Sequence, residues 1–129
     1  MRRKVKLALL GLLAVGYIGA GINHFVSPDF YVHIMPPYIP WHLAMVWISG
    51  VAEIVLGVGV LFPKTRQVSG WLILAMLAVF MTVHVHMLTA PEGTYDAPRW
   101  ALWARLPMQA VLAAWAWWAT RTDPEDAIA

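Results

Sequence analysis

The chain has 129 residues, of which 60% are hydrophobic and only 12% are charged, and its formal net charge is +2. A soluble domain of this length would need far more surface charge, so the composition predicts a single domain, residues 1–129, embedded in a lipid bilayer. The small positive charge is not a nucleic-acid signature, and no nucleic-acid partner is expected. The chain has no cysteine, which excludes disulfide exchange and iron–sulfur clusters held by its own thiolates.

Four apolar stretches are each long enough to cross a bilayer. The first could be read as a signal peptide, but its apolar run is longer than usual and favours a retained helix. Because backbone groups in lipid must be satisfied within their own helix, such spans pack most simply as an antiparallel bundle. We therefore predict an all-α fold, an integral membrane antiparallel four-helix bundle, with spans at about 5–24, 41–62, 68–88 and 98–119.

The predicted connections carry their own signals. The outward loop at 25–40 is rich in proline and aromatic residues, and Ser27-Pro28-Asp29 is typical of a capped helix start, here of a short interfacial helix to about Met35. The sequence PKTRQ predicts a basic turn between the second and third spans. Glycines in the first span are expected to let a neighbouring helix approach closely, at Gly11, Gly16, Gly19 and Gly21.

Lysine and arginine predict the orientation. Most of them flank one side of the predicted spans, while Arg99 alone flanks the other. The first group is Arg2, Arg3, Lys4, Lys6, Lys64, Arg66 and Arg121. By the positive-inside rule both termini are cytoplasmic, and we expect a multi-pass protein of the bacterial cytoplasmic (inner) membrane.

Glu53 lies near the middle of the second span, where an acid costs about 2.5–3.5 kcal/mol on insertion scales. We expect Arg105, in the fourth span, to be its counter-charge. Two interpretations are open at this stage. The pair locks two helices together, or it forms the charged floor of a ligand pocket.

Other polar residues share the outer half of the predicted bundle. Ser49 and Glu53 lie four residues apart, as do Arg105 and Gln109, so each pair shares one helix face. His84 and His86 are two residues apart, about 200° around a helix, so they cannot both face inward. The smaller, partly polar stripe that contains His86 favours His86 as the inward residue. The predicted ligand-binding pocket consists of Glu53, Arg105, Gln109, His86, His84, Asn23 and Ser49.

Metal and catalytic chemistry are not predicted. The histidine spacing matches no metal motif, so a site formed by His84, His86 and His24 is only a weak alternative, and neither haem nor copper is expected. No catalytic residues and no catalytic activity of the chain on its own are predicted.

Three segments carry a family resemblance: HFVSPDFYVHIMPPYIPWH, SGVAEIVLGVGVLFPKTR and WARLPMQ. Together they resemble the DoxX family of small four-helix bacterial membrane proteins. The third span departs from the family, with FMTVHVHM where relatives often show a proline and an asparagine before a methionine. The family's name comes from a small subunit associated with a thiosulfate:quinone oxidoreductase. The resemblance implies the same fold and a role in a membrane redox system.

Two functions are therefore expected. The first is an accessory subunit of a membrane redox system that binds a quinone or another small ligand, with a membrane redox protein or a second copy of the chain as partner. The alternative is a non-catalytic assembly module, in which the buried polar residues only specify helix packing.

Overall fold

The computed structural model describes residues 2–91, 93–95 and 97–121, and every regular element within them is a helix. The predicted all-α class is confirmed. The helices are α1 (Arg2–Val26), α2 (Pro28–Ile34), α3 (His42–Gly59), α4 (Pro63–Thr89) and α5 (Arg99–Thr120).

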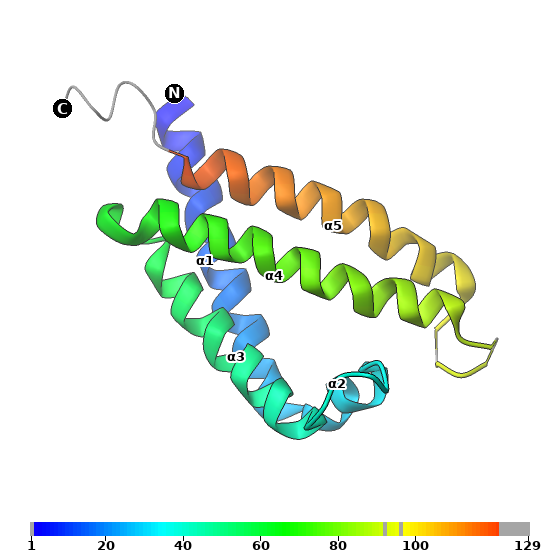
Figure 1. Ribbon diagram of the computed structural model, residues 1–129. Coiled ribbons are helices and arrows are strands. Elements are labelled where there is room, and N and C mark those ends of the chain that lie inside the picture. Colours follow the sequence, from blue (N-terminus) through cyan, green and yellow to red (C-terminus); the bar gives the residue numbers. More distant parts are fainter. Residues whose placement is uncertain (1, 92, 96, 122–129) are drawn as a thin grey trace.

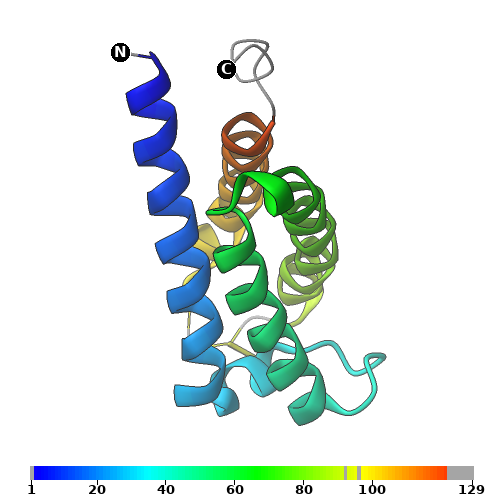
Figure 2. The ribbon, with the colours of Figure 1, turned by 90° about the vertical axis from the view of Figure 1, so that its left-hand side faces the viewer.

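The four long helices form two antiparallel pairs (Figure 1). α1 packs along α3, α4 packs along α5, and the two pairs cross at an angle. Figure 2 shows α1 and α3 side by side over most of their length. The start of α1 meets the end of α5, where Lys6 Nζ donates a hydrogen bond to the Arg121 carbonyl at 2.9 Å. The two ends of the described chain therefore lie at the same end of the molecule.

Among the described residues, three helices are long and apolar enough to cross a membrane, namely α1, α3 and α4. α5 is a helix of 22 residues at the position of the predicted fourth span, but it does not reach the same apolarity. The reason is its composition, because Arg105, Gln109 and several tryptophans lower its mean hydropathy.

The turn between α3 and α4 is shorter than predicted. α4 begins at Pro63, at the first helical position, rather than at 68, so PKTRQ forms its first turn. The side chains of this turn satisfy the last carbonyls of α3. Thr65 Oγ1 donates to the Gly59 carbonyl at 2.6 Å, and Arg66 Nε donates to the Val60 carbonyl at 2.8 Å. This segment therefore serves as the C-terminal cap of α3.

The short interfacial helix is present as α2, with Pro28 in its first turn. Ser27 occupies the N-cap position, but its hydroxyl makes no capping hydrogen bond, so that detail of the prediction is wrong. The Ser27 amide donates to the Asn23 carbonyl at 2.9 Å, which satisfies a carbonyl at the end of α1.

α1 and α3 approach closely at three glycines, Gly21, Gly50 and Gly57. A Cβ on Gly21 would lie 2.6 Å from the Gly50 carbonyl oxygen, and a Cβ on Gly50 would lie 2.8 Å from the Cβ of His24. Gly11, Gly16 and Gly19 have open space around them. Of the glycines expected to form a contact surface on the first helix, only Gly21 does so.

Two apolar clusters hold the ends of the molecule together. The larger joins α1, α3, α4 and α5 near the ends of the described chain, and includes Ile73, Val60 and Ala116, all fully buried. The smaller joins α4 and α5 at the opposite end, around Met87 and Leu102. The residues of α4 and α5 between these clusters face a cavity.

Replacing Gly50 with alanine is expected to destabilise the protein by about 1–3 kcal/mol, because the new methyl group would overlap the backbone of α1. The measurement is the free energy of unfolding in detergent micelles. The matched control is Gly19→Ala, whose methyl group meets no atom within 4 Å and which should be neutral or stabilising. Equal effects of the two variants would contradict the close contact.

Candidate ligand-binding cavity

A cavity of about 480 Å³ lies between the two helix pairs, and α1 to α5 all contribute to its walls. Most of the lining is apolar, from residues such as Leu13, Phe80 and Leu112. α2 covers one end with Phe30 and Ile34. The polar lining residues are Tyr17, His24, Tyr31, Ser49, Glu53, His84, Arg105 and Gln109.

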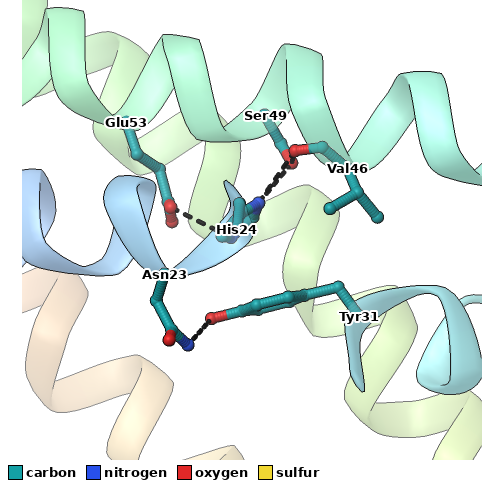
Figure 3. Close-up of polar contacts among 6 residues, drawn as sticks. All are labelled: Asn23, His24, Tyr31, Val46, Ser49 and Glu53. Atoms are coloured by element: carbon teal, nitrogen blue, oxygen red, sulfur yellow. Dashed lines mark hydrogen bonds and ion pairs between the residues drawn. The ribbon is translucent and has the colours of Figure 1, made fainter. Parts of the chain in front are cut away.

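Glu53 is buried, and its ionisable partner is His24 of α1 (Figure 3). His24 Nε2 lies 3.1 Å from Glu53 Oε2, with both side chains more than nine-tenths buried. The contact is an ion-pair approach rather than a well-aligned hydrogen bond, because Oε2 has no hydrogen-bond partner of good geometry. The expected Glu53–Arg105 pair is therefore corrected. α3 packs against α1, whereas Arg105 belongs to α5, which packs against α4.

The other ring nitrogen of His24 fixes its tautomer. Nδ1 lies 2.9 Å from the Val46 carbonyl oxygen, which can only accept, so Nδ1 carries a hydrogen. Ser49 Oγ donates to the same carbonyl at 2.9 Å and lies 3.0 Å from Nδ1. If neither Nε2 nor Oε2 carried a proton, two lone pairs would face each other at 3.1 Å. One proton is therefore shared between them, and the His24–Glu53 pair has no net charge.

A second polar pair lies on the opposite wall of the cavity. Gln109, only 6% exposed, and His84 are joined by a hydrogen bond between their Nε2 atoms at 2.7 Å. An amide nitrogen can only donate, so His84 Nε2 accepts and Nδ1 carries the hydrogen. His84 Nδ1 and Gln109 Oε1 are then a buried donor and a buried acceptor without partners. If the Gln109 amide is turned over, its oxygen accepts from His84 Nε2–H. The unpartnered atoms are then the Gln109 amide nitrogen, a donor, and His84 Nδ1, an acceptor.

His84, and not His86, is the histidine of α4 at the cavity. The stripe that faces inward contains Ile73, Leu77 and His84, while Thr82 and Val79 are exposed. The expectation for His86 is wrong because the apolar stripe of Ile73 and Leu77 packs against the other helices, which turns His84 of the same stripe to the cavity. His86 instead contacts Tyr38 of the loop, with ring centroids 6.3 Å apart.

Asn23 lies beside the cavity rather than on its wall. Its Nδ2 donates to the Tyr31 hydroxyl at 2.7 Å, and this contact ties α1 to α2 (Figure 3). Tyr31 also stacks on His24, with ring centroids 3.9 Å apart. Tyr31 is thus the residue of α2 that contacts the His24–Glu53 pair.

Arg105 lines the cavity and is half-buried. Its Nη1 donates a long hydrogen bond to Met87 Sδ, at 3.8 Å. Within residues 2–91, 93–95 and 97–121, no carboxylate lies within ion-pair distance of its guanidinium.

Sequence reasoning assigned His24 only to the weak metal alternative and did not single out Tyr17, whose buried hydroxyl has no partner. His24 follows Gly21 by three residues, so a small residue and a histidine share one face of α1, and this spacing was the available signal. The three histidines of the metal alternative have different partners. His24 contacts Glu53, His84 contacts Gln109, and His86 contacts Tyr38. In the described part of the chain, no group of three acidic or histidine side chains is placed to hold a metal ion.

Fold and cavity together define an all-α protein with membrane-type apolar helices and an internal cavity that is polar on two walls. A family model described as a domain of unknown function, DUF8561, matches residues 13–120. The chain therefore belongs to this family, and the matched range contains every polar residue of the cavity. Neither the curated proteins nor the solved structures contain a significant match.

Replacing Glu53 with leucine is expected to cost about 1–3 kcal/mol of stability, because His24 Nε2 would be left buried without a partner. Glu53→Gln should cost less, since its amide can still hydrogen-bond to Nε2. The measurement is unfolding in detergent micelles, with Asp29→Asn, at an exposed acid on α2, as the control expected to change little. Equal losses for the two Glu53 variants would contradict the contact with His24.

Proposed function

We propose that the chain is an integral membrane protein that binds a small lipophilic ligand, with a quinone as the first candidate, and that it acts as an accessory subunit of a membrane redox system. The observation that carries this proposal is the cavity, in which unpartnered polar atoms of Tyr17, His84 and Gln109 accompany a largely apolar lining. A buried polar atom without a partner costs about 1–3 kcal/mol. A ligand with a polar head and an apolar body would repay that cost.

In this proposal four helices cross the bacterial cytoplasmic membrane, with α5 as the fourth. Its support is that α5 has a transmembrane length and lies antiparallel along α4, while its Arg105 and Gln109 face the cavity. Polar residues inside a membrane protein commonly face such cavities. The clustering of lysine and arginine near the ends of the described chain supports cytoplasmic termini.

The redox assignment rests on the resemblance to the DoxX family. The quoted segments fall at α2 and the following loop, at α3 and at the first half of α5, and all three supply lining residues. A quinone suits the unpartnered atoms of Tyr17, His84 and Gln109, because its carbonyl oxygens accept hydrogen bonds and its hydroquinone hydroxyls donate them. The second candidate, an assembly module without a ligand, is favoured by one observation, namely that the His24–Glu53 contact joins α1 to α3.

The double variant His84→Leu/Gln109→Leu separates the two functions. Replacing both partners of a buried hydrogen bond with apolar groups is nearly neutral for stability, so the variant should fold as well as the unmodified chain. We expect it to lose at least about tenfold in affinity for a ubiquinone analogue with a short alkyl tail. Binding is measured by the ligand-induced rise in the unfolding temperature.

The control for this variant is His86→Leu, because His86 lies on α4 but outside the cavity, and it should bind the analogue normally. If the analogue fails to stabilise the unmodified protein, and the double variant is strongly destabilised, the quinone proposal is wrong and the assembly function is favoured.

A further inference from the structure

The charges around the cavity do not balance. His24 and Glu53 share one proton and cancel, and His84 is hydrogen-bonded as a neutral ring. Arg105 is then the remaining charge among the described lining residues, and its guanidinium donates to a methionine sulfur, Met87 Sδ. A cation beside an apolar cavity carries a desolvation cost when it has no counter-ion. Binding an anion in the cavity would therefore be favourable.

Hydrogen-bonding capacity is gathered on the same wall. Arg105 and Gln109 are one turn apart on α5, and Gln109 is bonded to His84. In either orientation of the Gln109 amide, the His84–Gln109 pair leaves one unused N–H donor, and the Tyr17 hydroxyl on the facing helix can also donate. An arginine fork with nearby N–H and O–H donors is the arrangement that binds carboxylates.

The cavity is open on one side, between α1 and α5. Two of its lining residues there are strongly exposed, Leu12 at 58% and Met108 at 50%. Gly16 lies one turn from Leu12 on the rim, and a side chain built on it would meet no atom within 4 Å. The two helices are joined near the ends of the described chain, where Trp115 Nε1 donates to the Leu9 carbonyl at 3.1 Å. They diverge from there (Figure 1). The exposed residues Leu12 and Met108 make this opening apolar.

We propose that the cavity binds a single-chain lipid carboxylate, a fatty acid, with the carboxylate on Arg105, Gln109 and His84 and the hydrocarbon chain leaving past Gly16 into the bilayer. This inference rests on the proposed ligand-binding function but changes the class of ligand, because a quinone is neutral. One carboxylate balances the one charge of Arg105. A phosphate monoester carries about −1.5 to −2 charges and would exceed it.

The test uses delipidated full-length protein in a non-ionic detergent and radiolabelled palmitate. Competitors are hexadecanol, which has the same chain without the charge, hexadecyl phosphate, and the ubiquinone analogue. We expect hexadecanol to compete at least about tenfold more weakly than palmitate, because it forms no charge-assisted hydrogen bond. Equal competition by hexadecanol, or stronger competition by hexadecyl phosphate, would overturn the carboxylate assignment.

Arg105→Gln should remove the preference for palmitate over hexadecanol, whereas the control Arg99→Gln should keep it. Arg99 lies on the same helix but outside the cavity, where it donates to the Leu88 carbonyl. If Arg105→Gln does not fold, Arg105→Lys keeps the charge without the fork and should retain a reduced preference. An unchanged preference in the folded Arg105→Gln variant would overturn the inference.

The opening has its own matched pair of variants. Gly16→Leu should slow palmitate uptake several-fold, because its side chain fills the rim of the cavity. Gly19→Leu also enters open space, but away from the cavity, and should have no effect. Equal uptake by the two variants would overturn the proposed path of the hydrocarbon chain past Gly16.

The competition experiment also distinguishes failure of the fatty-acid inference from failure of the proposed ligand-binding function. Binding of the ubiquinone analogue without binding of palmitate would overturn the fatty-acid inference and leave the proposed ligand-binding function standing. Failure of every competitor and of palmitate itself would overturn both.

Discussion

The contact between Glu53 and His24 is the constraint on which the rest of the structure depends. A carboxylate in the middle of an apolar helix has to find a partner, and this partner lies on α1. The contact requires α1 and α3 to touch at backbone distance, which Gly21 and Gly50 allow. The Val46 carbonyl and Ser49 then hold the histidine ring from the other side. Position and rotation of the two helices are thereby fixed together.

Because the His24–Glu53 contact lies within α1 and α3, it leaves the other helix pair to satisfy its own polar groups. His84 and Gln109 do so only in part, and Arg105 finds no carboxylate in the described chain. Each helix pair is packed internally, and an incompletely satisfied space lies between the pairs. This division explains how a small protein without a large core can contain a cavity of about 480 Å³.

The same division assigns separate roles to the two polar walls. The α1–α3 wall is neutral and built into the packing, so its substitution should act mainly on stability. The α4–α5 wall carries the uncompensated charge of Arg105 and the unused polar atoms of His84 and Gln109, so its substitution should act mainly on binding. Tyr31 links the first wall to α2, which covers one end of the cavity. A quinone and a fatty acid would both use the second wall, and charge distinguishes them.

The all-α class and the approximate positions of the four long helices follow from the sequence, because hydropathy and helical rise are local properties. For the same reason Ser49, Glu53, Arg105 and Gln109 were placed on matching faces, and all four line the cavity. The partner of Glu53 depended on which helix lies nearest to α3, a property of close packing at Gly21 and Gly50 rather than of composition. The choice between His84 and His86 depended on the rotation of α4, which the burial of Ile73 and Leu77 decides. The position of a residue along its helix can be read from the sequence, because helical rise is local. The neighbours and the rotation of each helix are decided only when the helices pack.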